Sequence, residues 1–230
     1  MEDSYLKEFN AVVESVKDDK YIVFDKTAFY PEGGGQPCDT GFLIRENESF
    51  PVIFVGKFNG VISHEVSKAG LKQGDEITGK IDWQRRHLLM RNHTAAHVIS
   101  GLIHKETGAR ITGGSLGIDK SRIDFDLEVF DRKKLNDYFD MANELIQKDL
   151  PIKIYNISRE DAEKTEGISK LAIGLPVGVK KIRIVDIVGF DRQADGGCHV
   201  KSLKEIGRIE FLKAENKGKD NRRVYFRVCD

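Results

Sequence analysis

The segment WQRRHLLMRNHTAAHVISGLIHKETG, residues 83–108, decides the fold, because the hydrophobic period of the chain changes there. Before it, apolar residues alternate or form short runs typical of strands. Within it, they recur at helical spacing. We therefore predict a helix from about Trp83 that ends near Gly108, since glycine is favoured just beyond a helix C-terminus. The apolar positions that carry the helical period are Leu88, Leu89, Ala96, Ile99, Leu102 and Ile103.

The part before this helix, roughly the first 80 residues, predicts short strands. Residues 11–16 and 21–24 suit one hairpin, and residues 51–55 and 61–66 suit a second that turns at Asn59-Gly60. Short strands at this spacing, without a helical period between them, favour a small β-barrel. A glycine-rich loop, residues 33–37, interrupts the strands.

The part after the helix mixes strands and helices. Asp131 can cap a second amphipathic helix, and Ser158 with Asp161 can cap a short third one. The predicted class is α+β: an N-terminal small β-barrel domain, residues 1–85, then an antiparallel sheet with packed helices, residues 86–230. The strands predicted for the second domain are residues 111–117, 122–126, 152–155, 181–187, 207–212 and 223–228.

Composition narrows the class of protein. The 230 residues include 37 basic and 37 acidic ones, so the formal net charge is zero and binding to nucleic acid would need a local patch. The three cysteines, an odd number spread along the chain, argue against a disulfide framework. The N-terminus lacks the pattern of a signal peptide, and no apolar run is long enough to cross a bilayer. We expect a protein of the cytoplasm that does not bind membranes.

Two histidines, His93 and His97, lie four residues apart in the predicted helix and therefore on one face of it. A second group of possible ligands follows about a hundred residues later in Asp195-Gly196-Gly197-Cys198-His199. Together the two groups predict a Zn²⁺ site, with His199 as third ligand. Asp195 or a water is favoured as the fourth ligand over Cys198, because adjacent side chains in extended backbone point apart.

The neighbouring motifs allow more than one interpretation. Thr94 stands where a metalloprotease of the H-E-x-x-H type needs a glutamate, which argues against that class. The Gly33-Gly34-Gly35 run lacks the lysine and the spacing of a P-loop, so a turn between strands is the default. A cluster of Arg85, Arg86 and Arg91 usually forms a solvated helix face, but beside a metal site it could hold a phosphate backbone.

Four blocks in order resemble the editing region of alanyl-tRNA synthetases. Because the other synthetase domains do not fit in 230 residues, the chain resembles the free-standing alanyl-tRNA editing proteins of medium length, the AlaX group. The blocks are DKTAFYPEGGGQ at residues 25–36, DWQRR with MRNHTAAH at residues 82–97, GSL with RIDFD at residues 114–126, and DGGCHV with EIG at residues 195–207.

This resemblance implies a zinc-dependent deacylase that hydrolyses Ser-tRNA(Ala), with Gly-tRNA(Ala) as a second candidate substrate. It places Thr112 where the family has a polar residue that reads the substrate, although a strand threonine facing solvent fits equally well. The Gly33, Gly34, Gly35 and Gln36 loop would line the site or contact the tRNA end. The synthetases usually carry cysteine at the position of Asp195, and an aspartate can also bind zinc.

Two rival functions stay open: another zinc hydrolase, and a non-catalytic RNA-binding module with a structural zinc. A closed set of four protein ligands would favour the second. If the arginine cluster does not bind tRNA, the alternative surface is Lys180 and Lys181 with the Arg222-Arg223 hairpin. If Thr112 does not read serine, the other candidates are Ser115, Gln36 and Gln193.

Overall fold

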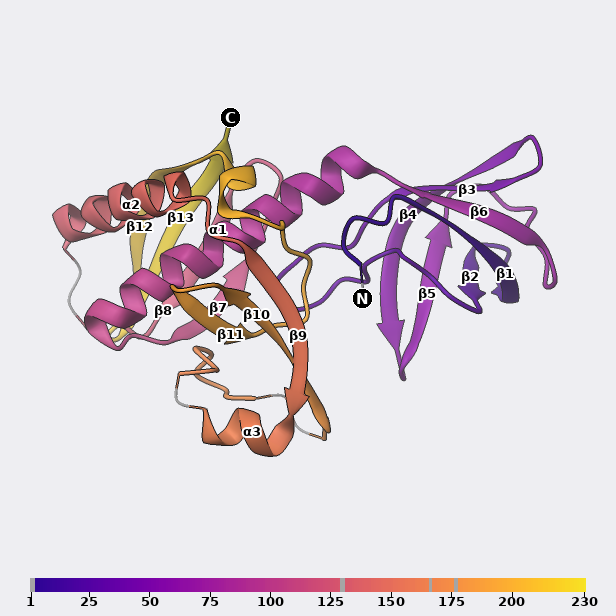
Figure 1. Ribbon diagram of the computed structural model, residues 1–230. Coiled ribbons are helices and arrows are strands. Elements are labelled where there is room, and N and C mark those ends of the chain that lie inside the picture. Colours follow the sequence, from indigo (N-terminus) through magenta and orange to yellow (C-terminus); the bar gives the residue numbers. More distant parts are fainter. Residues whose placement is uncertain (1–2, 129–130, 166, 176–177) are drawn as a thin grey trace. The chain divides into compact units, whose positions relative to one another are not determined.

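The computed structural model describes residues 3–128, 131–165, 167–175 and 178–230, and it divides into two compact units (Figure 1). The first unit is Met1–Leu88 and the second is Leu89–Asp230. The sequence predicted a boundary after residue 85, inside the first turn of the helix α1 (Trp83–Thr107), which crosses from one unit to the next.

The first unit is a closed β-barrel with strand order β1-β2-β5-β4-β3-β6, which confirms the predicted N-terminal barrel. Alternate residues along its strands point inward, so that Leu43, Phe50 and Val55 are completely buried. Both predicted hairpins are present, and the strand β3 pairs with β6 to close the barrel. The strands are β1 (Glu8–Lys17), β2 (Tyr21–Phe24), β3 (Gly41–Arg45), β4 (Glu48–Phe58), β5 (Val61–Val66) and β6 (Glu76–Ile81).

The turn between β4 and β5 shows why its sequence was informative. Asn59 and Gly60 both have positive φ, 50° and 87°. A two-residue hairpin turn needs this conformation at both positions, and asparagine and glycine adopt it at the least cost. The register of β4 against β5 is thereby fixed, with Phe58 opposite Val61.

In its described residues, the second unit combines helices with two antiparallel sheets, which confirms the predicted α+β class, although the sequence predicted a single sheet. A four-stranded sheet has the order β12-β13-β8-β7, and a three-stranded sheet has the order β11-β10-β9. Its elements are β7 (Ile111–Ser115), β8 (Ser121–Phe125), α2 (Arg132–Gln147), β9 (Ile152–Ser158), α3 (Arg159–Lys164), β10 (Lys181–Ile187), β11 (Asp191–Ala194), the 3-10 turn η1 (Leu203–Ile206), β12 (Arg208–Gly218) and β13 (Asn221–Cys229).

The helix α2 begins and packs as its sequence predicts. The Asp131 carboxylate accepts a hydrogen bond from the backbone N–H of Lys133 at 2.8 Å and so caps the N-terminus. On the buried side, the Asn143 amide makes two hydrogen bonds, 2.8 and 2.9 Å long, with the backbone of Ile209 in β12. These bonds fix α2 against the four-stranded sheet, where Figure 1 shows it beside β12 and β13.

The helix α1 is the central element of the second unit. Asp82 caps its N-terminus by accepting from the backbone N–H of Arg85 at 3.1 Å, and Gly108 follows its last turn with φ 71°. Residues 89–103 are almost all buried, because elements of the second unit surround this part of the helix. The two histidines of the helix therefore lie inside the protein. None of the helices in the described part of the chain combines the length and the hydrophobicity of a membrane-spanning segment.

Candidate metal centre

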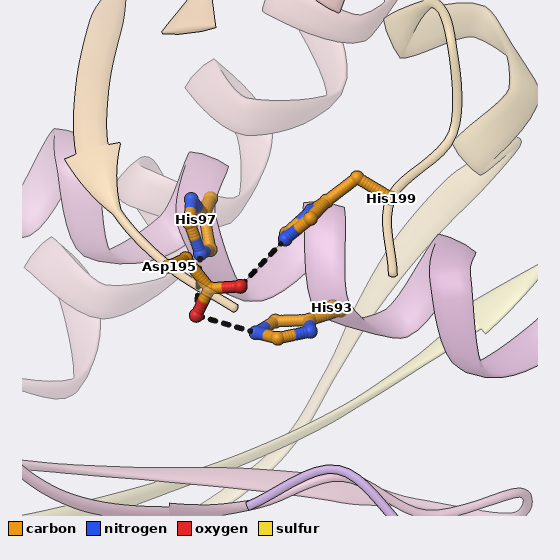
Figure 2. A group of neighbouring side chains, drawn as sticks. All are labelled: His93, His97, Asp195 and His199. Atoms are coloured by element: carbon orange, nitrogen blue, oxygen red, sulfur yellow. Dashed lines mark hydrogen bonds and ion pairs between the residues drawn. The ribbon is translucent and has the colours of Figure 1, made fainter. Parts of the chain in front are cut away.

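His93, His97, Asp195 and His199 converge on one point of the second unit (Figure 2). Their ligand atoms all lie within 4.8 Å of one another. One carboxylate reaches all three imidazoles: Asp195 Oδ1 lies 3.0 Å from His199 Nε2, and Asp195 Oδ2 lies 3.3 Å from His93 Nε2 and 3.8 Å from His97 Nε2. Three imidazole nitrogens around a carboxylate form a ligand set that suits zinc.

Two local features bring these side chains together. His93 and His97 are one helical turn apart, and their ring centroids lie 5.3 Å from each other. Asp195 directly follows β11, and its backbone is fixed by two hydrogen bonds to Arg183 of β10, 3.1 and 2.9 Å long. The Asp195 carboxylate also accepts from the backbone N–H of Gly197 at 2.6 Å, which turns the chain back so that His199 returns to the same centre.

Thr94 contacts the His199 ring at Nδ1, the nitrogen that does not face Asp195. The Thr94 hydroxyl donates to the carbonyl of Met90 at 3.0 Å and is 3.2 Å from His199 Nδ1. Because its one hydrogen is directed at Met90, the hydroxyl accepts from His199, so that Nδ1 carries the ring proton and Nε2 presents a lone pair to the centre. The same oxygen accepts from the backbone N–H of Val200 at 3.3 Å. Outer contacts of this kind set the tautomer of metal-binding histidines.

Thr94 is the residue next to the centre that sequence reasoning missed. It was considered only as the position of an absent glutamate, and its contacts to residues 199 and 200 lie more than a hundred positions along the chain. The available signal was its place directly after the first histidine, on the turn of the helix that also carries His97.

The electrostatics favour the protonation states that a metal requires. Burial lowers the pKa of His97, and it lowers the pKa of His199 well below its ordinary value. Burial alone would raise the pKa of Asp195, but the electrostatic interaction with His93 and hydrogen bonds with the three imidazoles hold it well below its usual range. The centre therefore favours an ionised carboxylate with neutral imidazoles at His97 and His199, as metal binding requires.

Cys198 does not belong to this cluster of ligand atoms in the described part of the chain. Its side chain is completely buried, next to His199 in sequence. Asp195 occupies the place beside the three imidazoles instead, with its side chain 19% exposed. The residues present thus fit a zinc ion with nitrogen and oxygen ligands.

The predicted substrate residues occur in both units. In the first unit, Gly33, Gly34 and Gly35 form an exposed turn, closed by hydrogen bonds between the backbones of Gly33 and Gln36, 2.9 and 3.1 Å long. The Gln36 side chain is completely buried there, so only the three glycines are exposed. In the second unit, Thr112 is exposed on β7.

The predicted basic patch needs a correction at Arg86, which is completely buried. Its guanidinium forms an ion pair with the buried Asp39 and donates to the carbonyls of Ser4 and Ala28, 2.9 and 2.6 Å away. A buried cation requires such partners, and Arg86 therefore cannot form part of a tRNA-binding surface. It holds the start of α1 to the barrel within the first unit.

Arg85 and Arg91 are half-buried and bind backbone carbonyls. The guanidinium of Arg85 donates twice to Cys38, at 3.2 Å. That of Arg91 donates to Ile206 at 3.0 Å and to Cys229 at 2.9 Å. Contact of these two arginines with tRNA stays a prediction.

Comparison with known proteins identifies the relatives of this chain. Residues 4–85 match the family model "tRNA synthetases class II (A)", and residues 182–225 match "Threonyl and Alanyl tRNA synthetase second additional domain". The chain is 52% identical to the alanyl-tRNA editing protein AlaX-M of Methanosarcina barkeri, over 99% of this chain and 97% of the relative. It is 45% identical to AlaX-M of Saccharolobus solfataricus, over 99% and 97% of the two chains.

A longer relative shows the same region inside a synthetase. The alanine–tRNA ligase of Pyrobaculum aerophilum is 38% identical over 93% of this chain, which corresponds to 25% of the ligase. Because the similarity to the AlaX-M proteins extends over nearly the full length of both chains, this chain belongs to the family of alanyl-tRNA editing proteins of the AlaX-M type.

Proposed function

We propose that the protein is a zinc-dependent deacylase that hydrolyses Ser-tRNA(Ala) in trans, with Gly-tRNA(Ala) as its second candidate substrate. The observation that carries the proposal is the convergence of His93, His97, Asp195 and His199 in a member of an editing family. An aminoacyl ester is an activated bond, so a site of modest catalytic power suffices for its hydrolysis.

His93, His97 and His199, with Asp195, would hold the zinc. Bound zinc supplies a Lewis acid that can polarise the ester carbonyl or a water. Two groups of the protein prepare the ligands for the metal. Thr94 keeps the Nδ1 proton on His199, and the Asp195 carboxylate provides the negative charge that gathers three buried imidazoles. Within the H-T-A-A-H segment, Thr94 replaces the general base that peptidases carry, which favours an ester substrate.

Selectivity for serine over alanine requires a polar group, because alanine is the smaller amino acid and a size limit cannot exclude it. A pocket that pairs a hydroxyl disfavours the analogue that lacks it. We assign this role to Thr112, whose side chain is exposed on β7 and so accessible to a ligand. The exposed Gly33 to Gly35 turn of the first unit is the proposed contact for the tRNA end.

A second candidate function is a non-catalytic RNA-binding module with a structural zinc. It is favoured by one observation: the cluster offers four protein ligands, enough to complete a tetrahedral shell. The two functions differ in whether the metal has an accessible position for water or substrate.

One experiment separates the two. The protein is incubated with Ser-tRNA(Ala), Gly-tRNA(Ala) and Ala-tRNA(Ala), and release of the amino acid is followed before and after removal of the metal by a chelator. The deacylase should release serine, spare alanine and lose activity with the metal, then recover it with added zinc. A protein that binds zinc and tRNA but releases no amino acid is the RNA-binding module.

A further inference from the structure

One face of the four-stranded sheet carries a basic surface with a tyrosine at its centre, which we call the Tyr225 face. Its side chains come from β12, β13, β8 and the loop before β8. The basic and aromatic members are Lys120, Arg122, Lys213, Lys217, Arg223, Tyr225 and Arg227, and the acidic members are Asp124, Glu210 and Glu215.

The Tyr225 face is the side of the sheet opposite the helices. Val224 and Phe226 of β13 are 1% and 0% exposed, and the residues that alternate with them point the other way. Both helices bind the side with the buried residues. The ring of Phe139 in α2 lies 5.2 Å from the ring of Phe211, and Ser121 of β8 donates to Asn92 of α1 at 2.9 Å.

The Tyr225 face concentrates positive charge in a chain whose net charge is zero. Six basic and three acidic side chains give it a net charge of 6 − 3 = +3. The two lysines of β12 are accessible: the side chains of Lys213 and Lys217 are 56% and 39% exposed, and both pair with the carboxylate of Glu215, at 2.6 and 2.9 Å. A local excess of this kind attracts a polyanion even when the protein as a whole is neutral.

The cations of the Tyr225 face are held in place before any ligand binds. The Asp124 carboxylate accepts two hydrogen bonds from Arg223, 2.7 and 2.8 Å long, and one from Arg122 at 2.8 Å. The ammonium groups of Lys213 and Lys120 lie 4.8 and 5.9 Å from the centroid of the Tyr225 ring. Ordered cations lose less side-chain entropy when they bind phosphates.

The hairpin that carries Lys217 is also fixed. The buried guanidinium of Arg222 donates to the carbonyls of Gly218 and Glu128, both at 2.7 Å, and so connects the tip of the β12–β13 hairpin to the segment after β8. The Tyr225 face is therefore one connected surface across three strands.

We propose that the Tyr225 face binds the phosphate backbone of the tRNA body. This inference rests on the proposed function, which makes tRNA the partner, and it places the contact on the sheet instead of the arginines of α1. Several cations presented by successive strands, with an aromatic ring among them, match a phosphate chain in charge and in extent. Such contacts position the RNA without reading its sequence.

The test is the affinity for unacylated tRNA(Ala), measured by filter binding across a series of salt concentrations. The double variant Lys213→Gln/Lys217→Gln removes two charges from the Tyr225 face. We expect its dissociation constant to rise roughly 10-fold or more, and the slope of log K against log salt to fall by about two, one for each lost phosphate contact. The matched control is Lys133→Gln/Lys134→Gln on the exposed side of α2, whose constant should stay within about twofold.

The double variant also leaves Glu215 without its two lysine partners, which could itself weaken binding. A second variant, Lys120→Gln in the loop before β8, avoids this effect. It should weaken tRNA binding and reduce the slope of log K against log salt by about one. Zinc content and thermal unfolding should match the wild type in all variants. The proposal is overturned if both variants bind tRNA(Ala) as the control does. If they instead lose self-association at unchanged tRNA affinity, the face binds a second copy of the chain.

These experiments test the Tyr225 face and the proposed function separately. A wild-type protein that binds tRNA(Ala) through these lysines but releases no amino acid would refute the deacylase and keep the surface. If the wild type deacylates its substrate but the lysine variants bind tRNA(Ala) as tightly as it does, the proposed activity stands and the proposed role of the Tyr225 face is refuted.

Discussion

Replacing Thr94 by valine tests whether the centre depends on contacts behind its ligands. Valine keeps the shape of threonine and removes only the hydroxyl, which is completely buried. Two donors then lose their acceptor: His199 Nδ1–H, 3.2 Å away, and the backbone N–H of Val200, 3.3 Å away. The carbonyl of Met90 loses one donor as well.

The magnitude follows from these lost contacts. A buried donor left without a partner costs about 1–3 kcal/mol, so the two donors together destabilise the second unit by at least about 2 kcal/mol. The loss of an outer contact to a metal ligand typically lowers metal affinity by about 10- to 100-fold, or about 1.4–2.7 kcal/mol. We expect zinc affinity and serine release at limiting zinc to fall together by this factor, because His199 is free to rotate or change tautomer.

The assay is a zinc titration against a competing chelator, with thermal unfolding recorded on the same samples. Thr107→Val is the matched control. Thr107 lies on the same helix, donates to the carbonyl of Ile103 at 2.6 Å and accepts from the N–H of Ala109 at 3.1 Å, but contacts no ligand. It should lose some stability and keep its zinc affinity. Thr94→Ser, which retains the hydroxyl, should recover most of the affinity. Zinc binding by Thr94→Val that equals the wild type would refute the role of Thr94.

Three further predictions concern the metal, the substrate and the barrel. His97→Ala should lose zinc and deacylation while the fold persists, and full zinc occupancy by metal analysis would contradict the ligand assignment. Thr112→Val should slow serine release by roughly 2- to 10-fold, with alanine release little changed; equal rates would transfer the role to Ser115 or Gln193. Burial lowers the pKa of His64 to about 4 from the ordinary 6.5, so the unfolded chain takes up a proton first as the pH falls. Barrel stability should drop by about 3 kcal/mol between pH 7 and pH 4, as denaturant titration can show, and His64→Gln should flatten that dependence.

Local signals predicted most of the second unit and four of the six barrel strands. The caps at Asp131 and Ser158, the Asn59-Gly60 turn and the helical period after Trp83 each act within a few residues, and each has the predicted structure. The strands β3, β6 and β11 were not predicted. Each is at most six residues long, and β3 and β6 are defined by their pairing across the barrel, which no local pattern records.

In the candidate site, too, features that depend on nearby residues could be predicted and those that depend on distant residues could not. The spacing of His93 and His97 is local and could be read directly. The burial of Arg86 could not, because its partner Asp39 is 47 residues away and a helical arginine is usually solvated. To predict a patch of cations from sequence, one must therefore know which of the cationic side chains are themselves buried. For the Tyr225 face, the sequence of β13 does predict which side chains are accessible, because Arg223 and Tyr225 alternate with the apolar Val224 and Phe226, which are buried.

Asp195 would give the proposed zinc centre an oxygen ligand, where the resemblance to the synthetases leads us to expect sulfur. A thiolate offers a single ligand atom, whereas the carboxylate places one oxygen beside His199 and the other beside His93 and His97. Both groups carry one negative charge when ionised, so either can balance part of the charge of a bound cation among the three imidazoles. What changes is the hardness of the ligand, since oxygen favours zinc less strongly over harder divalent ions than sulfur does. In the proposed zinc centre, selectivity for zinc would then rest on the three histidines, two of which are placed by the pitch of α1 and the third of which lies beside the Thr94 hydroxyl.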